Sequence, residues 1–364
     1  MKNLLRLLLK SQHQRNRSEL AQTEKGMTLV ELLVGAIMAF LIITPMLGFV
    51  VDMLNTDRRE QVKSNTEQDI QAAVDFIAQD LSQAIYIYDN SANGVPGLVA
   101  GNFIPSAAAT NGTPILVFWK RQQLKNSIPI VPGDKPSSCA QNTPLKGAGA
   151  CNDTYVLSLV AYYQVRGGPG IWCQPSGGTC PTRIVRYQIQ DGLRDPTKST
   201  DPIPANRYFA DGDLKNPDGQ KRSLAFNIGA PNVAGFDISK PTEKVTNPNV
   251  AWDRVDVLVN YIDYGTKPEF IGNECTTALG NPTTQTGITT SFILEDTLKV
   301  TDRTTKINSF YACVDTQRNL ARVTIRGNSL RRLQADADYD PNNPKPAYFP
   351  TASVQVQGLG ARGN

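Results

Sequence analysis

The sequence predicts an α+β protein in which a long amino-terminal helix leads into a head of mostly antiparallel strands. Residues 27–51 are mostly apolar and carry a single charge, on one acid, and this run is long enough for a transmembrane helix. Apolar residues then recur every three or four positions over residues 70–88, as on one face of an amphipathic helix. Beyond these, several segments rich in Val, Ile, Tyr and Thr have a period of two, which is typical of strands.

These patterns divide the chain into four parts. The expected parts are a basic leader (1–26), a long helix (27–88, with 27–51 transmembrane), a β-rich globular head (89–335) and a carboxyl-terminal tail (336–364). The tail lacks a core pattern, so we expect it to be extended or mobile. Segments 122–150 and 191–221 are rich in Pro, Gly, Asn and Asp, and are expected to be surface excursions.

The charge of the chain is concentrated in the leader. Six Lys and Arg against two Glu give residues 1–26 a charge of +4, which leaves 31 basic and 31 acidic residues in the remainder (37 − 6 and 33 − 2). Nucleic-acid binding depends on clustered positive charge, so no nucleic-acid partner is expected. The single histidine, His13, also lies in the leader, so the rest of the chain has no His-dependent catalytic arrangement and we expect no enzyme.

The apolar run has the length and the flanking charges of a membrane span. Its 25 residues would form a helix of about 37 Å, against a hydrocarbon layer of about 30 Å. The basic residues precede it, which predicts a cytoplasmic start and a head on the other side. A cleaved secretory signal would need a small-x-small site after the run, and none is evident. A plain anchor would leave the acid Glu31 unexplained, because a carboxylate in a bilayer is costly.

The residues around this acid form a recognisable motif. Gly26 is followed by Met27 and then by TLVELL, with Glu31 in the fifth position after the glycine. This stretch resembles the processing site of type IV pilins and the related pseudopilins. The resemblance implies that a prepilin peptidase cuts between Gly26 and Met27 and methylates the new amino terminus on Met27. The leader is longer than in many pilins, and Met27 stands where Phe is more frequent.

The resemblance also implies a role for Glu31 in filament assembly. If such helices pack into a filament core, the amino group of one subunit is buried, and an unpaired buried charge costs several kcal/mol. A carboxylate on a neighbouring helix would pair with that amino group. Glu31 would thereby favour one axial stagger between subunits, as a single polar residue does in a coiled-coil seam.

The second part of the helix and the strands follow from periodicity. The expected helical face consists of Ile70, Val74, Ile77, Leu81, Ile85 and Tyr88, with Gln71, Asp75, Gln79 and Asp80 off that face. The expected strands are 115–120, 154–165, 183–190, 254–263, 309–314 and 321–326. A long helix on a strand-rich head is also the pilin-like plan that the resemblance implies. Cyanobacterial pseudopilins that support hormogonium polysaccharide secretion and gliding share the long leader, the motif and a large head.

Two further groups of residues are candidate sites. Six cysteines follow the apolar run without a CxxC pair, which favours disulfides in an oxidising compartment. Sequential pairing is the economical expectation, and the other connectivities remain open. The candidate pairs are Cys139 with Cys151, Cys173 with Cys180, and Cys275 with Cys313. Two acidic clusters offer hard oxygen ligands for calcium, with polar turns as the alternative. They comprise Asp211, Asp213, Asn216 and Asp218, and Asp336, Asp338 and Asp340.

These observations predict a minor pilin or pseudopilin of a type IV pilus-like or type II secretion-like filament. The filament would support secretion and motility, and polysaccharide is one candidate for the secreted material. The implied partners are the prepilin peptidase, other pilins, an inner-membrane assembly platform with its ATPase, and an exported polysaccharide. The chain would cross the inner membrane once, with a periplasmic head, and then join a filament in the periplasm or at the cell surface. Apart from calcium, no cofactor is expected. One alternative is a pilin-scaffold adhesin or glycan-binding module, and another is a membrane-anchored hydrolase with paired carboxylates.

Overall fold

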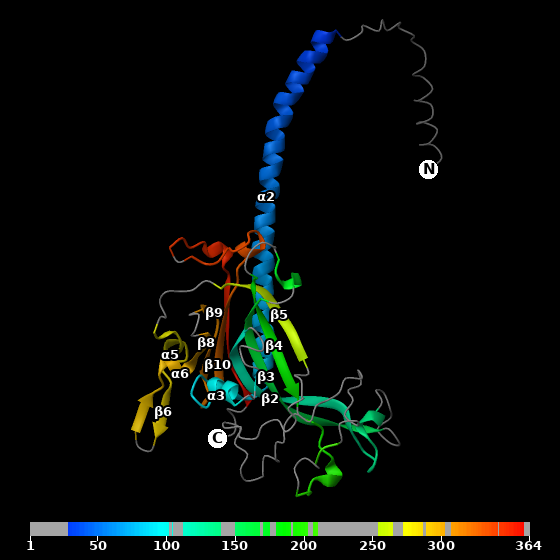
Figure 1. Cartoon of the computed structure of the whole chain (residues 1–364), viewed down its shortest axis with the longest axis vertical. Coiled ribbons are helices and arrows are strands. Elements are labelled where there is room, and N and C mark those ends of the chain that lie inside the picture. Colours follow the sequence, from blue (N-terminus) through cyan, green and yellow to red (C-terminus); the bar gives the residue numbers. More distant parts are fainter. Residues whose placement is uncertain are drawn as a thin grey trace, which may run out of the picture. The chain divides into compact units, whose positions relative to one another are not determined.

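The chain forms an α+β fold (Figure 1). The computed structural model describes residues 28–101, 104, 112–139, 150–167, 170–174, 180–190, 192–202, 207–209, 254–264, 272–286, 289–302, 307–340 and 342–359. The chain separates into two units, one up to Arg58 and one from Arg59 onward. The first unit holds the start of a long helix, and the second unit is the head.

Helix α2 extends from Leu29 to Ser82. Its amino-terminal half is rich in Leu, Ala and Met, which are strong helix formers, and Pro45 lies inside it without ending it. In the second unit, α2 buries one stripe of apolar side chains, which confirms the amphipathic face predicted over this part of the helix. The buried apolar residues of this stripe are Ile70, Ala73, Val74, Ile77 and Leu81.

The predicted end of this helix at about Tyr88 is wrong. The helix ends at Ser82, whose hydroxyl donates a hydrogen bond to the Gln79 carbonyl oxygen, and residues Ala84–Tyr88 form strand β1. These residues, AIYIY, are β-branched and aromatic, so they suit a sheet. Ile87 and Tyr88 are buried there, paired with strand β2. The apolar spacing of this segment was compatible with either structure, and pairing with a distant strand decided between them.

The first sheet of the head has five antiparallel strands in the order β1-β2-β3-β4-β5. Its other strands are β2 (Gly112–Pro129), β3 (Cys151–Arg166), β4 (Thr182–Gln190) and β5 (Arg254–Ile262). Three of the predicted strands lie within them and a fourth, 254–263, exceeds β5 by one residue, which confirms that part of the expectation. The excursion predicted from residue 122 begins later, because β2 continues to Pro129 through pairs with the start of β3.

The second sheet has the order β11-β10-β9-β8, also antiparallel. Its strands are β8 (Lys299–Asp302), β9 (Ile307–Asp315), β10 (Leu320–Arg326) and β11 (Thr351–Gln357). Strands β9 and β10 were predicted. The expectation of an extended or mobile tail from residue 336 is wrong for β11, which pairs with β10 along its whole length. Alternate residues Ala352, Val354 and Val356 pack against the core.

One hydrophobic core joins the α2 stripe to both sheets. Its most buried large side chains include Tyr162, Tyr163 and Phe118 from the first sheet and Phe310 from the second. Among the described residues, a short hairpin and three short α-helices lie outside the two sheets. They are β6 (Thr283–Thr286), β7 (Thr289–Phe292), α3 (Val95–Ala100), α5 (Glu274–Ala278) and α6 (Glu295–Leu298).

Candidate functional site

The acid of the processing motif lies in the first turn of α2. Gly26 and Met27 lie outside the described residues, and Thr28 is the residue before the helix. The Thr28 hydroxyl accepts a hydrogen bond of 3.3 Å from the Glu31 backbone N–H, which is the pattern of a helix amino-terminal cap. A carboxylate in the first turn is favoured by the positive end of the helix dipole. The Glu31 side chain is exposed, so it is available to a partner.

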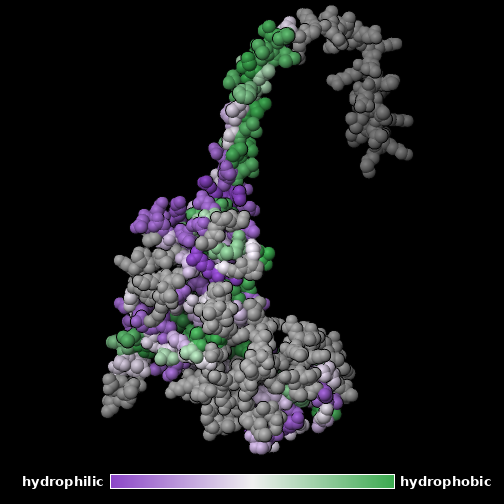
Figure 2. All heavy atoms as spheres, in the orientation of Figure 1, coloured by the Kyte–Doolittle hydropathy of each residue, from purple (hydrophilic) through white to green (hydrophobic). Residues whose placement is uncertain are grey.

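The apolar segment that follows is covered by no other described part of the chain. Its large hydrophobic side chains from Leu29 to Leu54 are exposed, and the segment has the length and hydropathy of a membrane span. Figure 2 shows this apolar surface along the amino-terminal part of α2. An apolar surface of this extent needs a hydrocarbon layer or other apolar helices around it, because water does not stabilise it.

Two glycines lie within this apolar segment. A Cβ atom added at Gly35 or Gly48 would have no heavy atom within 4 Å. Neither glycine is therefore required for packing within the described residues. Between them, the Thr44 hydroxyl donates a hydrogen bond of 2.8 Å to the Phe40 carbonyl oxygen. This bond keeps the polar atom of Thr44 satisfied within an apolar segment.

The structure describes only the second of the two acidic clusters considered for calcium. Asp211, Asp213, Asn216 and Asp218 lie outside the described residues. In the second cluster, Asp336 pairs with Arg331 at 3.3 Å, and a carboxylate oxygen of Asp340 accepts a hydrogen bond from the Asn342 N–H. No group of three His, Cys, Asp or Glu with metal-binding geometry occurs among the residues that the structure describes.

The pKa of the Asp338 carboxyl is raised, first by burial and then by the neighbouring charge of Asp263. Arg331 and Arg166 act in the opposite direction on this pKa but do not cancel the rise. Asp263 itself is fully buried and pairs with Arg326 at 2.6 Å. Its carboxylate also accepts a hydrogen bond from the Tyr339 backbone N–H. Asp263 therefore fastens the segment after β10 to the end of β5.

Three disulfides join the six cysteines in sequential order, the pairing favoured on sequence grounds. They are Cys139–Cys151, Cys173–Cys180 and Cys275–Cys313, with sequence separations of 12, 7 and 38. The first ties the end of the 3₁₀ turn Pro136–Ser138 to the start of β3. The third ties α5 to β9, so it connects elements that are far apart in the chain.

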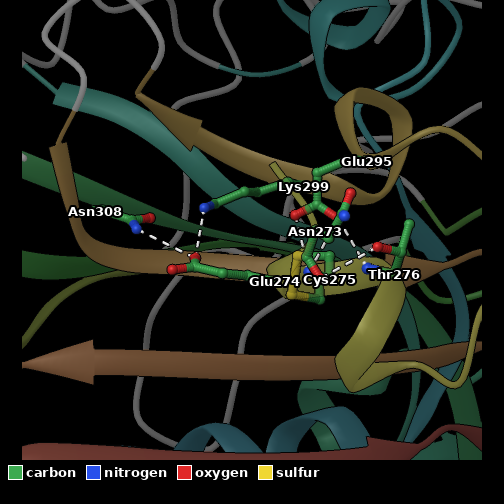
Figure 3. The surroundings of a disulfide bond; sticks show 8 residues. Asn273, Glu274, Cys275, Thr276, Glu295, Lys299 and Asn308 are labelled. Atoms are coloured by element: carbon green, nitrogen blue, oxygen red, sulfur yellow. Dashed lines mark hydrogen bonds and ion pairs between the residues drawn. A yellow bond between two sulfur atoms is a disulfide. The ribbon is translucent and has the colours of Figure 1, made fainter. Parts of the chain in front are cut away.

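The surroundings of the third disulfide form a compact polar and apolar junction (Figure 3). The Glu295 carboxylate accepts hydrogen bonds of 2.8 Å from the backbone N–H groups of Cys275 and Thr276. The adjacent Glu274 accepts from Lys299, at 2.7 Å, and from Asn308, at 3.2 Å. These bonds satisfy both carboxylates and hold the short helix α5 against β8 and β9. The arrangement is suited to fixing structure, because both acids are already paired.

The head also contains a buried charge cluster that sequence reasoning missed. Asp80, assigned to the polar side of the helix, is buried, with 6% of its surface exposed. Its carboxylate accepts from Lys120 at 2.6 Å, from Arg186 at 2.7 Å and from the Tyr162 hydroxyl at 2.7 Å. A signal was present: Asp80 follows Ile77 by three residues, so it lies beside the buried stripe.

This cluster joins the helix to the first sheet. Lys120, Tyr162 and Arg186 come from β2, β3 and β4, so one carboxylate on α2 binds three adjacent strands. The network extends from Arg186 to Gln188 at 2.7 Å. Burial by itself raises the pKa of Asp80, but the two cations outweigh it and lower that pKa. The carboxylate therefore stays charged in the folded head.

A cavity of about 310 Å³ lies beyond the end of β2. Its lining includes the apolar residues Ile130, Val131 and Phe209 and the charged residues Lys198 and Asp195. The Asp195 carboxylate is held by the Thr197 backbone and hydroxyl groups at 2.9 and 2.6 Å. The volume is at the lower end of the range for small-ligand sites.

The comparisons with known proteins add no relative. The chain matches no protein-family model, no curated protein and no solved structure.

Proposed function

We propose that the chain is a minor pilin or pseudopilin, a structural subunit of a type IV pilus-like or type II secretion-like filament. The observation that carries the proposal is a single carboxylate, Glu31, in an otherwise uncharged segment of 25 residues directly after Gly26. A plain anchor has no use for this carboxylate. A filament core does, because a neighbouring subunit's amino terminus must be neutralised there.

The physical properties of α2 and of the head support this role. The exposed apolar segment can exchange lipid contacts for contacts with equivalent helices, since both surroundings are apolar. The head has three disulfides, as suits an oxidising compartment outside the cytoplasm. In this proposal the head is periplasmic, the peptidase and assembly platform act at the inner membrane, and the subunit contributes no catalysis of its own. The filament supports secretion and motility, and the proposed secreted material is a polysaccharide.

Processing after Gly26 provides the direct test. In a host with its prepilin peptidase, intact-mass analysis of the membrane-derived protein should give a chain that begins at Met27 and carries one added methyl group. Without the peptidase, the chain should retain residues 1–26. A Gly26→Ala variant should remain uncut in both hosts, with its head still folded and disulfide-bonded. A chain cut after Val51, or left uncut in the host with peptidase, would contradict the proposal.

The assembly role of Glu31 gives a second expected result. Glu31→Gln should leave processing and membrane insertion intact, and lower the amount recovered in sheared filaments at least about tenfold, because a buried amino group loses its charged partner. The matched control is Asp52→Asn, which removes the acid just after the apolar segment. Carbonate extraction measures insertion, and immunoblotting of the sheared fraction measures incorporation. Equal incorporation of the two variants would show that Glu31 has no such role.

A further inference from the structure

We propose that strand β11 is a docking edge, at which an extended strand from a different filament subunit pairs with the chain and continues its second sheet. The docking edge is the side of Thr351–Gln357 that faces away from β10. The choice of a filament subunit as partner rests on the proposed function, whereas the strand pairing rests on the backbone of β11 alone.

The hydrogen bonds at the two ends of β11 fix which of its backbone groups reach β10. The Gly327 N–H donates to the Pro350 carbonyl oxygen at 2.8 Å, and the Gly358 N–H donates to the Asn319 carbonyl oxygen at 2.9 Å. Both contacts continue the register between the two strands. Bonded residues alternate along an antiparallel strand, so the even-numbered residues of β11 bond to β10. The N–H and C=O groups of the odd-numbered residues therefore face away from β10.

Four residues direct their backbone groups outward along this edge. They are Thr351, Ser353, Gln355 and Gln357, and all four are exposed. The only strand beside β11 is β10, and no other residue that the structure describes bonds to their backbone N–H or C=O groups. A row of unpaired N–H and C=O groups is the template on which an extended peptide adds a strand to a sheet.

β11 lacks the features that protect a sheet edge from such pairing. Its seven residues carry no charge and no proline, and they pair with β10 without a register shift. The outer strands β1, β5 and β8 each have a register shift, and the hairpin strands β6 and β7 have four residues each. Natural proteins shorten, charge or bulge their edge strands to prevent pairing. A long, regular and uncharged edge is therefore suited to a partner strand.

The side chains of β11 define the chemistry of the partner strand. Ala352, Val354 and Val356 are partly buried and pack against the core, so the core-facing side is incompletely covered at this edge. The outward-bonding residues place Thr, Ser and Gln side chains on the opposite face. Directly opposite residues of an antiparallel pair lie on the same face and interact. The partner strand therefore alternates apolar residues, which extend the core-facing side, with uncharged polar residues.

A second copy of the chain does not fit this edge within one filament. Gly327, just after β10, lies against Ile70 of α2, whereas Asn319, just before β10, bonds to the Ala84 carbonyl oxygen beyond the end of α2. Strand β10 therefore runs opposite to the part of α2 in the head, and β11 runs parallel to it. Two β11 strands paired about a two-fold axis are antiparallel, which would set these parts of the two helices antiparallel. Subunits of one filament share a direction, so the partner is a different subunit.

The test uses the full chain in detergent micelles and a fluorescent peptide of sequence TASVQVQ, which has the required alternation and is free to adopt an antiparallel register. Fluorescence anisotropy should show saturable binding, and hydrogen exchange of segment 351–357 should become slower. Gln355→Pro removes one outward N–H, a position at which an edge strand tolerates proline. This variant should bind the peptide at least about tenfold more weakly. Near-ultraviolet circular dichroism measures whether its head is folded.

Two N-methylated peptides provide matched controls on unchanged protein. In antiparallel pairing the peptide bonds to β11 through the positions equivalent to Ser353 and Gln355, because equivalent faces then meet. N-methylation at these two positions should abolish binding. N-methylation at the positions equivalent to Val354 and Val356 adds the same two methyl groups to the other side of the peptide and should leave binding unchanged.

Two results would overturn the inference. No binding of the unmodified peptide, or equal binding of the two N-methylated peptides, would show that β11 does not accept a strand. Sedimentation should give a monomeric chain in the micelles, and a dimer that Gln355→Pro abolishes would show that the edge serves a second copy instead. Peptide binding does not require cleavage after Gly26. Its failure in a chain that is processed normally would therefore overturn this inference and leave the proposed function in place.

Discussion

Asp80→Ala is expected to lower the free energy of unfolding by about 3–5 kcal/mol, because it leaves two buried cations without their carboxylate. Lys120 and Arg186 approach Asp80 at 2.6 and 2.7 Å and have little access to water. The Tyr162 hydroxyl also loses its acceptor. Guanidinium unfolding of the full chain in detergent, followed by near-ultraviolet circular dichroism, measures the change.

The matched control for this variant is Asp75→Ala. Asp75 lies on the same helix, is exposed, and accepts a hydrogen bond from Gln71 at 3.0 Å. Exposed pairs of this kind contribute about 0.2–0.5 kcal/mol. Losses of equal size in the two variants would show that the buried cluster does not hold the helix to the sheet.

The same cluster predicts a pH dependence. Because the pKa of Asp80 is lowered from 3.8 in the folded chain, its charge stabilises the fold above pH 3.8. That contribution is lost as the pH falls from 3.8 through the folded pKa. The difference in unfolding free energy between the wild-type chain and Asp80→Asn should therefore be constant above about pH 5 and shrink below pH 3.8. A difference that grows on acidification would contradict the lowered pKa.

Removing the third disulfide is expected to have the next largest effect on stability. The Cys275–Cys313 bond spans 38 residues, for which the loop-entropy relation gives about 4 kcal/mol. A Cys275→Ala/Cys313→Ala double variant should lose about this amount in the same unfolding assay. It should also loosen α5 from β9, although Glu274, Glu295 and their partners remain.

Removal of the shortest disulfide provides the comparison. The Cys173–Cys180 bond spans 7 residues, and the same relation gives about 2 kcal/mol. The Cys173→Ala/Cys180→Ala variant should therefore be the more stable of the two. If the Cys275→Ala/Cys313→Ala variant were the more stable of the two, the longer loop closed by the Cys275–Cys313 disulfide would not reduce the entropy of the unfolded chain by the larger amount.

The strands that periodicity identified share one property. Strand β3 contains a long, mostly apolar stretch that the core covers, and β4 contributes Ile184, Val185 and Ile189 to the same core, so both sequences carry a local signal of burial. β11 carries a weaker signal, because its alternate residues are Ala and Val facing the core and Thr, Ser and Gln facing outward. It is a strand because β10 offers seven paired positions. The sequence of residues 336–364 does not by itself indicate that this segment pairs with β10.

The candidate sites also differ in whether their residues are close together or far apart in the sequence. Cys139 with Cys151 and Cys173 with Cys180 are close in sequence, so proximity alone favoured these pairs. Asp80 differs, because its cations come from positions 40 and 106 residues further along the chain. A helical pattern read locally assigns such an acid to the solvent side. Its burial becomes evident once the strands that bring the cations are in place.

The sequence by itself determined the apolar segment with Glu31, the amphipathic stripe from Ile70 to Leu81 and the main strands, because each is a local pattern of polarity. Tertiary structure alone decided that the helix ends at Ser82, that β1 and β11 are strands, and that Asp80 is buried. The physical reason is the same in each case. Backbone pairing and charge pairing depend on partners that are distant in the chain, and the free energy of these contacts exceeds the weak local preferences.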